Sequence, residues 1–471
     1  MVVGEMPEGV DMLVVGGGPG GYTAALASAR LGRKVVLVDA DGSAGLGGVC
    51  VNVGCIPSKA LIELATSVHD RAEWATRGLP QPGTQIDMVA FQAWKSAIVS
   101  KLNGGVRNLL TTAGVEIHTG YFRFSRPDQG VVERSDGPPR HLQFTSCILA
   151  TGSRPVQLAI LPRDGTRILD STDVLALTAL PRSAAVIGGG YIGVELGTAL
   201  AKLGVEVSII EAEPSLLPGI GSQAGDLVAK RLRALDASVL TSTTVTGDDG
   251  HRLTLETNTG TEHLDVEIVV VAVGRLPNTD DVGLDTVGIT TGARGLLSVG
   301  PDRLVTKRIA AIGDITDGPA LAHKASAEAH VAAEALSGHR AEFNPLTIAA
   351  VVFSDPEVAT TGLTIDDAIA AGYTADTAAF PVAASGRAQT LADDLGATHW
   401  TFDKESGVVL GAQIIGPHAT ELISEASIAV EMGANLEDIA STIHPHPTMS
   451  ETLAEAALVG LGRPIHVSRR R

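Results

Sequence analysis

A glycine-rich motif that occurs twice, 172 residues apart, constrains the fold more than any other feature of the chain. Each copy has glycines at G-x-G-x-x-G spacing directly after an apolar segment: Gly16, Gly18 and Gly21 in the first copy, and Gly188, Gly190 and Gly193 in the second. A helical pattern follows each copy, and a Val- or Ile-rich segment then ends in an acid, Asp39 or Glu211. The chain therefore repeats one unit of strand, turn, helix and strand.

These residue types meet the physical requirements of a dinucleotide site. Glycines permit a tight turn, a close approach of backbone to pyrophosphate, and packing of the helix on the strand, while the start of the helix offers free N–H groups to the anion. An acid at the end of the second strand binds ribose hydroxyls. One such motif could be an ordinary glycine-rich turn. Two in the same context predict an α/β fold with two Rossmann-like dinucleotide-binding domains.

The acid of the second copy indicates which nicotinamide is bound. Glu211 would accept a hydrogen bond from a free 2′-hydroxyl and would repel a 2′-phosphate. No arginine follows it at positions 212–214 to accommodate such a phosphate. We therefore expect NAD and not NADP at the second site.

Two cysteines, Cys50 and Cys55, have the spacing of an unusual redox pair. Residues five apart in a regular helix rise about 7.5 Å, which exceeds the roughly 7 Å limit for bridging two Cα atoms. A bridge therefore needs distorted backbone, which Asn52, Gly54 and Pro57 would fit. A bridge of this kind is easily reduced and reopened, so it suits a catalytic couple.

A structural disulfide and a zinc site both fit the cysteine pair less well. Only 3 cysteines occur in 471 residues, which is far from the cysteine density of disulfide-stabilised secreted frameworks. A zinc site would need a second Cys or His pair at ligand spacing, and none accompanies these two, so we expect no metal. Cys147 lies in an apolar run and is expected to be a buried core thiol.

Two dinucleotide sites and a redox disulfide together predict relay chemistry. Electrons would pass between the thiol pair and a nicotinamide through a second bound dinucleotide, most naturally a flavin. We expect FAD at the first site and NAD at the second.

Composition and charge exclude several other classes of protein. The hydrophobic content of 44% supplies an ample core, so the chain is not a candidate for disorder. A formal net charge of −18 would repel the phosphates of nucleic acid. Residues 1–11 have no basic or apolar leader segment, and no apolar run approaches the roughly 18 residues of a membrane span. We therefore expect a cytoplasmic enzyme that contacts neither nucleic acid nor membrane.

A histidine near the C-terminus is the candidate base for the thiols. A thiol with a pKa near 8.5 is a poor nucleophile at pH 7 until a base removes its proton, and histidine titrates in the appropriate range. Glu451 follows His446 by five residues and could accept a hydrogen bond from its other ring nitrogen. The alternative is a Pro-rich surface loop that happens to contain two histidines.

These features resemble the pyridine nucleotide-disulfide oxidoreductases from the first glycine motif to the C-terminal tail. The motifs that carry the resemblance are 47–59 (GGVCVNVGCIPSK), 150–153 (ATGS), 274–278 (GRLPN), 312–314 (IGD), 321–325 (LAHKA) and 444–451 (HPHPTMSE). The family implies a C-terminal α+β dimerisation domain in addition to the FAD and NAD domains. The expected division is 1–151 for the FAD domain, 152–274 for the NAD domain, 275–345 for a central region that completes the FAD domain, and 346–471 for the dimer interface.

The resemblance also assigns roles to single residues. Cys50 would be the interchange thiol that meets substrate, and Cys55 would lie against the flavin. The resemblance implies a Lys59–Glu195 pair beside the flavin, with Asp314 on the ribityl chain and Asp39 on the adenosine ribose. The other residues implied to bind FAD are Thr151, Gly152 and Ala322. Gly274 would belong to the NAD site. The family more often has Glu at position 39 and Thr and Leu at positions 49 and 51, where this chain has Asp39, Val49 and Val51.

The family implies a homodimer in which His446 lies near the partner subunit's Cys50, with a cis peptide bond before Pro447. The similarity is greatest to members that oxidise dihydrolipoamide, the lipoyl group of 2-oxoacid dehydrogenase or glycine cleavage complexes. The alternative activity is an NAD(P)H-dependent reduction of another small disulfide or of mercuric ion, although residues 462–469 lack the cysteine pair of mercuric reductases. A third possibility is a flavoprotein whose main role is to dock on a large dehydrogenase complex.

Overall fold

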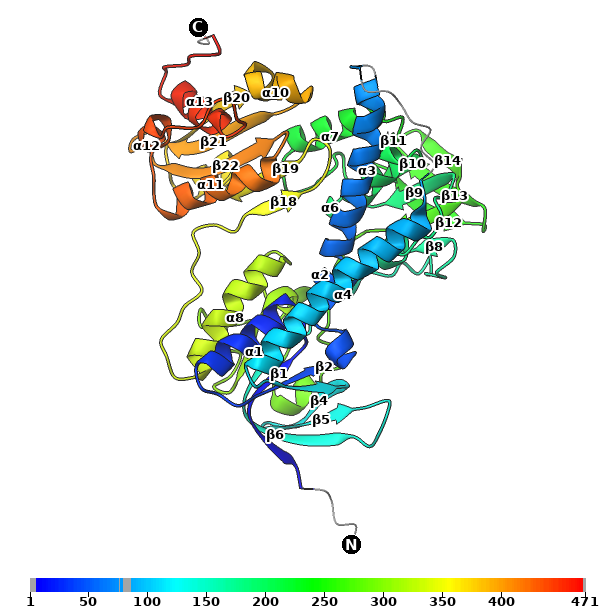
Figure 1. The fold of residues 1–471 in the computed structure, drawn as a ribbon, viewed down its shortest axis with the longest axis vertical. Coiled ribbons are helices and arrows are strands. Elements are labelled where there is room, and N and C mark those ends of the chain that lie inside the picture. The colour runs from blue at the N-terminus through cyan, green and yellow to red at the C-terminus, as the bar shows by residue number, and fades with distance from the viewer. Residues whose placement is uncertain (1–5, 76, 79–85, 469–471) are drawn as a thin grey trace.

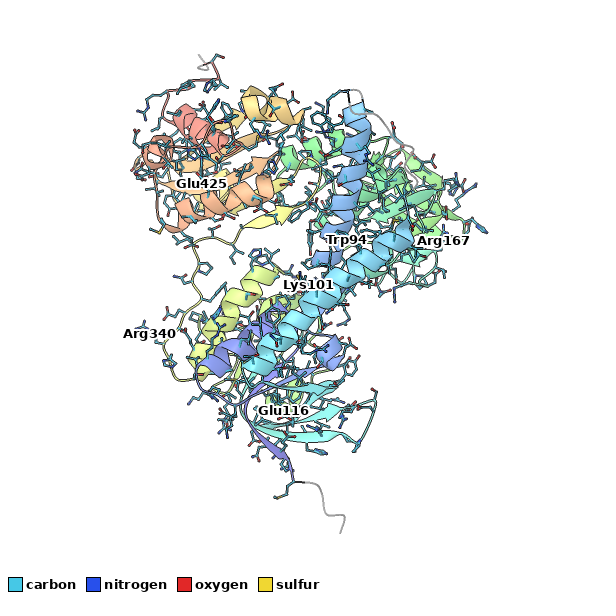
Figure 2. All side chains as sticks on the ribbon, viewed as in Figure 1. Trp94, Lys101, Glu116, Arg167, Arg340 and Glu425 are labelled. Atoms are coloured by element: carbon cyan, nitrogen blue, oxygen red, sulfur yellow. The ribbon has the colours of Figure 1, made fainter. Side chains whose placement is uncertain are left out.

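The computed structural model describes residues 6–75, 77–78 and 86–468, and Figure 1 shows their arrangement. Within these residues, one seven-stranded and two five-stranded sheets form the centres of three regions. The C-terminal sheet and its helices lie at the upper left of Figure 1, apart from the N-terminal sheet at the bottom. In Figure 2, Arg340 marks the connection between these two regions and Glu425 marks a helix of the C-terminal region.

The first sheet has the strand order β3-β2-β1-β6-β5-β4, and β17 pairs with β6. Its strands are β1 Glu8–Val15, β2 Val35–Asp39, β3 Glu116–Thr119, β4 Tyr121–Arg126, β5 Gln129–Glu133, β6 Arg140–Leu149 and β17 Ile309–Ala311. Strands β3, β2, β1, β6 and β17 are parallel, while β4 and β5 form an antiparallel extension. Helices α1 (Pro19–Arg30) and α8 (Ala322–Leu336) pack together over this sheet. Residues 309–336 thus return to the N-terminal region.

The second sheet is entirely parallel and has the strand order β11-β10-β9-β15-β8. Its strands are β8 Ile168–Leu169, β9 Ser183–Ile187, β10 Glu206–Ile210, β11 Ser238–Leu240 and β15 Ile268–Val271. Its helices are α5 Ser171–Leu175, α6 Tyr191–Lys202 and α7 Ser222–Ala234. An antiparallel sheet of β12 (Thr244–Asp248), β13 (Arg252–Thr257) and β14 (Gly260–Asp265) is attached, and β7 (Ser153–Pro155) pairs with β16 (Arg275–Pro277).

The C-terminal sheet is antiparallel in the order β18-β19-β22-β21-β20. Its strands are β18 Ala350–Val352, β19 Val358–Gly362, β20 Ala375–Pro381, β21 Ala397–Asp403 and β22 Val409–Ile415. The helices of this region are α9 Ile365–Ala370, α10 Gly386–Leu391, α11 Ala419–Glu431, α12 Leu436–Ser441 and α13 Glu451–Gly460. Trp400 is fully buried and donates its indole N–H to the Leu453 carbonyl at 2.9 Å, which joins the sheet to α13.

Three helices connect the first two sheets: α2 (Gly48–Asn52), α3 (Cys55–Ala75) and α4 (Met88–Thr112). In Figure 1 α4 crosses from the first sheet toward the second, and α3 rises beside α6. Packing of α3 on α6 brings the N-terminal third of the chain against the second dinucleotide unit. In chain order these helices lie between β2 and β3 of the first sheet.

The predicted repeat is a structural repeat, which confirms the α/β fold with two Rossmann-like units. Gly16 (φ +102°) and Gly188 (φ +106°) end β1 and β9 in the same conformation, which glycine adopts most readily. A Cβ on Gly21 would stand 1.8 Å from the Gly16 carbonyl oxygen, and a Cβ on Gly193 would stand 1.9 Å from that of Gly188. In both units, therefore, the third glycine lets the helix rest directly on the turn.

This packing predicts that Gly193→Ala destabilises the second unit. The added methyl group overlaps a backbone oxygen and forces α6 away from β9, so the free energy of unfolding should fall by about 1–3 kcal/mol. Gly190→Ala is the matched control, because its Cβ would meet nothing within 4 Å. Denaturant unfolding of the control should match the parent within about 0.5 kcal/mol. Equal stabilities for the two variants would contradict the packing argument.

Candidate active site

A cavity of about 560 Å³ lies where the first glycine motif, the cysteine segment and the second unit meet. Residues expected at the flavin and thiol sites that line it are Gly16, Gly18, Asp39, Cys50, Cys55, Lys59, Thr151, Gly152, Glu195, Asp314 and Ala322. Gly21 packs behind the turn instead. The residues expected at the NAD site, Gly188, Gly190, Gly193, Glu211 and Gly274, are not part of this lining. The structure thus brings both cysteines together with the first dinucleotide motif.

The cysteine segment has the distorted backbone that its spacing predicts. Helix α2 ends at Asn52, and α3 begins at Cys55. Gly54 lies in the break, where a Cβ would stand 2.9 Å from the Val49 carbonyl oxygen. The Asn52 amide donates to the carbonyls of Gly45, Leu46 and Gly48 at 3.0–3.3 Å, so it holds the preceding turn. This break brings the two sulfurs together.

The two cysteines of the pair have different acidities. Both are free thiols in the structure, and Cys50 donates a hydrogen bond to the Cys55 sulfur. This bond, assisted by the positive charge of Lys59, outweighs burial and lowers the pKa of Cys55 to about 7. The same bond, burial and the charge of Cys55 raise the pKa of Cys50. In the reduced pair Cys55 is therefore the more acidic thiol and ionises before Cys50. Cys147 is fully buried, as expected for a core thiol.

An ion pair lies beside the thiols. The Lys59 ammonium, one helical turn after Cys55, donates to Glu195 Oε2 at 2.8 Å. Glu195 is on α6 and is only 5% exposed, so its charge depends on hydrogen-bonding partners. The expected Lys59–Glu195 pair is thus formed, and it connects the two dinucleotide units across the cavity.

The acids of the two motifs make the same backbone contact. The Gly17 N–H donates to Asp39 at 2.8 Å, and the Gly189 N–H donates to Glu211 at 2.5 Å. Asp41 and Glu213 each donate a further backbone N–H to these carboxylates. A carboxylate has about four lone-pair sites, so each acid can still accept from a ribose hydroxyl. Burial raises the pKa of Asp39 above its ordinary value.

The middle glycines show that both units fit a dinucleotide. The nearest atom to a Cβ on Gly18 would be 4.0 Å away, and a Cβ on Gly190 would meet nothing within 4 Å. Neither glycine is in the left-handed region, with φ of −67° and −71°. Protein packing and backbone conformation therefore do not require glycine here, but close approach of a pyrophosphate does. Helices α1 and α6 both begin without a side-chain cap, which leaves N–H groups for the anion.

The far wall of the cavity contains contacts that the sequence analysis did not select. Ser153 donates to Asp314 at 2.6 Å and accepts from Arg275 Nε at 2.8 Å. The Thr151 hydroxyl and the Asn278 amide each donate to the other residue's carbonyl, at 2.7 and 2.9 Å. All four hydrogen bonds join residues more than 120 positions apart, so no local pattern could reveal them.

His446 and Glu451 form the expected pair. His446 Nδ1 lies 2.8 Å from Glu451 Oε1, and the Thr448 N–H donates to Oε2 at 2.8 Å. Although burial favours the protonated acid, these two contacts hold the pKa of Glu451 below its ordinary value. The peptide bond before Pro447 is cis, as the family resemblance implies. His446 is 79% exposed and does not line the cavity. Within one chain, therefore, His446 and the two thiols do not share a site.

Two other histidines of the C-terminal region pair with glutamates. His444 lies 2.7 Å from Glu425, which ties the loop to α11. His466 lies 2.7 Å from Glu455, one turn after Glu451 on α13. The second oxygen of Glu455 is buried and lacks a hydrogen-bond partner within the described part of the chain. The two pairs join residues 19 and 11 positions apart, and the sequence analysis did not identify either partner.

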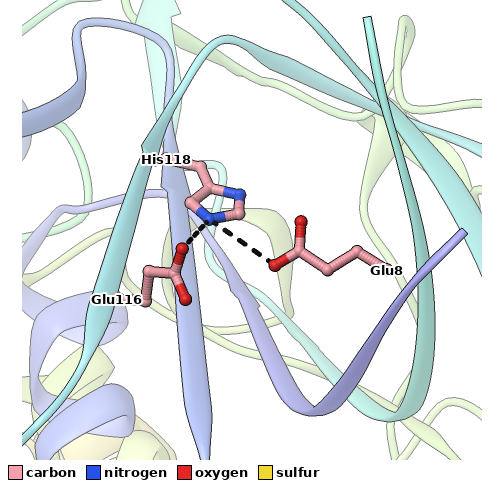
Figure 3. Close-up of side chains that lie close together, drawn as sticks. All are labelled: Glu8, Glu116 and His118. Carbon is pink, nitrogen blue, oxygen red and sulfur yellow. Dashed lines mark hydrogen bonds and ion pairs between the residues drawn. The ribbon is translucent and has the colours of Figure 1, made fainter.

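A separate cluster on the first sheet contains Glu8, Glu116 and His118 (Figure 3). His118 Nε2 lies 2.8 Å from Glu116 and 4.0 Å from Glu8. An Arg140 nitrogen approaches the same His118 atom at 2.9 Å and lies 3.6 Å from Glu8. The Arg140 guanidinium lies within ion-pair distance of both acids, at 3.6 Å from Glu8 and 3.9 Å from Glu116, so the cluster is an ion-pair network.

Two family models match the chain. The model described as pyridine nucleotide-disulphide oxidoreductase matches residues 10–329. The model described as the dimerisation domain of the same family matches residues 348–457. Together they include both dinucleotide units and the C-terminal sheet.

Curated relatives and solved structures agree with these matches. The chain is 45% identical to dihydrolipoyl dehydrogenase of Geobacillus stearothermophilus, covering 99% of both chains. It is 42% identical to dihydrolipoyl dehydrogenase of Halobacterium salinarum, covering 100% of both. The crystal structure of LpdA from Mycobacterium tuberculosis superposes with a TM-score of 0.87 and 26% identity, over 95% of this chain and 99% of that one.

The hydrogen bond between the thiols predicts that Cys50→Ala raises the pKa of Cys55. Alkylation of Cys55 by iodoacetamide in the reduced protein should have its midpoint near pH 7. Without the Cys50 donor, the midpoint should move toward the ordinary value of about 8.5. Peptide mass spectrometry across a pH series measures this, and Cys147→Ser serves as control with an unchanged midpoint. A midpoint that stays near pH 7 in Cys50→Ala would rule out the hydrogen bond as the cause.

Proposed function

The chain belongs to the pyridine nucleotide-disulphide oxidoreductase family, and from this we propose that it oxidises dihydrolipoamide with NAD, using FAD and the Cys50–Cys55 couple. The observation that carries the proposal is the arrangement of the thiol pair beside the first dinucleotide motif, in a chain similar over its full length to dihydrolipoyl dehydrogenases. Bound FAD would take the electron pair from the thiols and supply hydride to NAD.

The thiol chemistry begins at Cys50. A dihydrolipoamide thiolate attacks Cys50 in the disulfide, forms a mixed disulfide and releases Cys55 as thiolate. The second substrate thiol then attacks its own mixed disulfide, which releases lipoamide and leaves both cysteines reduced. Two electrons move from substrate to the cysteine pair, and of the two protons that leave the substrate one ends on Cys50 and the other on the base. A pKa of about 7 makes Cys55 a good leaving group in the first step.

The base that accepts protons from the substrate thiols and returns one of them to Cys50 is His446 in our proposal. Its Nδ1 is held by Glu451 at 2.8 Å, so Nε2 remains available to accept a proton from a substrate thiol. Glu451 fixes the ring orientation and stabilises the charged imidazolium. Since His446 lies outside the cavity of its own chain, we propose that it serves the cavity of a partner subunit in a homodimer. The match of residues 348–457 to a dimerisation domain supports that assembly.

The buried acid of the second unit supports NAD as the acceptor. Glu211 is 8% exposed and already accepts the Gly189 N–H. A 2′-phosphate beside it would place like charges together in a poorly solvated position. The middle glycine of the same motif leaves room for pyrophosphate, so Gly188, Gly190, Gly193, Glu211 and Gly274 are our proposed NAD residues.

We further propose a cytoplasmic enzyme that serves a 2-oxoacid dehydrogenase complex. Within the described residues, one helical stretch, Gly48–Ala75, is long and apolar enough to cross a membrane by length and composition. That stretch contains Cys50, Cys55 and Lys59 and packs on α6, so we assign it to the active site. A lipoyl domain of such a complex would present the dithiol substrate.

The direct test is NAD reduction by dihydrolipoamide with the purified flavoprotein. We expect NAD-specific turnover, with NADP at least tenfold less effective because of Glu211. Parallel assays with NADPH and either glutathione disulfide or Hg²⁺ address the alternative substrates. If the protein reduces glutathione disulfide or Hg²⁺ and does not oxidise dihydrolipoamide, the proposed substrate is wrong. The proposed transfer of electrons among thiols, flavin and nicotinamide would still stand.

If His446 is the base, replacing it should slow the oxidation of dihydrolipoamide. His446→Gln should lower kcat for dihydrolipoamide by about 10²–10⁴-fold, because proton transfer from the substrate thiol loses its acceptor. Steady-state kinetics between pH 6 and 9 measure this. His339→Gln, at an exposed position outside the site, is the control and should retain the parent rate. A His446→Gln enzyme with parent kcat would exclude His446 as the base.

A further inference from the structure

The connection between β18 and β19 contacts both members of the ion pair beside the thiols. The Phe353 N–H donates to Glu195 Oε1 at 3.0 Å, while Glu195 Oε2 accepts from Lys59. The Lys59 nitrogen lies 4.3 Å from the centroid of the Phe353 ring. A single residue of the C-terminal region therefore contacts the carboxylate through its backbone and the ammonium through its ring.

A second contact fixes the same connection to α6. Asp355 pairs with the Lys202 nitrogen at 2.8 Å and with Arg231 Nε at 3.1 Å. Lys202 follows Glu195 by seven residues, which is about two helical turns and places both on one face of α6. The Lys202 and Asp355 side chains are 9% and 14% exposed. The backbone around Phe353 is thus anchored at two points of one helix.

Lys59 needs such a support to stay near the thiols. Its side chain is 32% exposed, and a lysine in that environment retains much of its rotamer freedom. A ring face attracts an ammonium and restricts it to one side. Without the ring, the Lys59 nitrogen could move from the cavity toward solvent, where its charge would be screened from Cys55.

We propose that Phe353 is a positioning residue that fixes the Lys59–Glu195 pair beside Cys55, so that the C-terminal region sets the electrostatics of the thiol relay. The proposal rests on the redox role of the thiols in the proposed function. It does not depend on the identity of the substrate.

The expected readout is the acidity of Cys55, which the charge of Lys59 helps to increase and that of Glu195 decreases. The titratable and charged groups that face the thiol pair come from five elements: Tyr22 on α1, Cys50 on α2, Lys59 on α3, Tyr191 and Glu195 on α6, and Asp314 in the turn Gly313–Ile315. Of these, only Lys59 and Glu195 contact Phe353. A change at Phe353 should therefore reach Cys55 through that pair.

The test uses the holoenzyme, reduced with a phosphine and freed of reductant, and measures from pH 5 to 9 the absorbance band that a Cys55 thiolate gives by its contact with the flavin. Phe353→Leu should raise the midpoint by roughly half a pH unit, the size expected from an ordinary cation–π contact. Phe353→Tyr keeps a ring and should restore the parent midpoint. Asp355→Asn should shift the midpoint in the same direction by less. Asp376→Asn, which breaks an exposed pair with Lys404 in the same region, is the matched control.

An unchanged midpoint in Phe353→Leu, or an equal shift in Asp376→Asn, would overturn the proposal. If Phe353→Leu does not fold, Asp355→Asn decides the question: a raised midpoint supports the proposal, and an unchanged one overturns it. The absorbance readout is independent of turnover. A protein inactive toward dihydrolipoamide that still shows these shifts would therefore contradict only the proposed substrate.

Discussion

The helix break between α2 and α3 is the constraint on which the rest of the site depends. In a continuous helix the two cysteines would be about 7.5 Å apart along the axis. Gly54 permits the close approach to the Val49 carbonyl, and Asn52 holds the preceding turn by three hydrogen bonds. The break lets Cys50 donate to Cys55 and places Cys55 at the first residue of α3. Every later contact of the relay follows from that position.

A chain of contacts leads from Cys55 to the other two regions of the molecule. Lys59, one turn along α3, reaches Glu195 on α6, and Glu195 accepts the Phe353 N–H from the C-terminal region. The thiols therefore lie at a junction of all three regions. The base has a different origin, because the His446–Glu451 pair lies in the C-terminal region of the same chain but outside the cavity. In our account a second subunit completes the site.

The parts predicted from the residues alone are those that short segments determine, whereas the distant Lys59–Glu195 pair is expected only from the family resemblance. The two glycine motifs require their turns because Gly16 and Gly188 have positive φ and the third glycines pack against carbonyl oxygens. The cysteine spacing predicts a broken helix for a similarly local reason. Contacts such as Ser153 with Arg275, or Phe353 with Glu195, join residues more than 120 positions apart. Their partners depend on how the sheets pack, and a single sequence carries no signal for that arrangement.

The central claim is that thiols and base from different subunits form one active site, and a mixed dimer tests it most directly. A heterodimer of Cys50→Ser and His446→Gln chains, each with its own affinity tag, would contain one site with both parent residues and one with neither. If the base acts across the interface, the purified heterodimer should have about half the parent kcat, since one of its two symmetry-related sites is intact. If His446 acts within its own chain, both sites lack a group. If the heterodimer is no more active than the Cys50→Ser and His446→Gln homodimers, the account is contradicted.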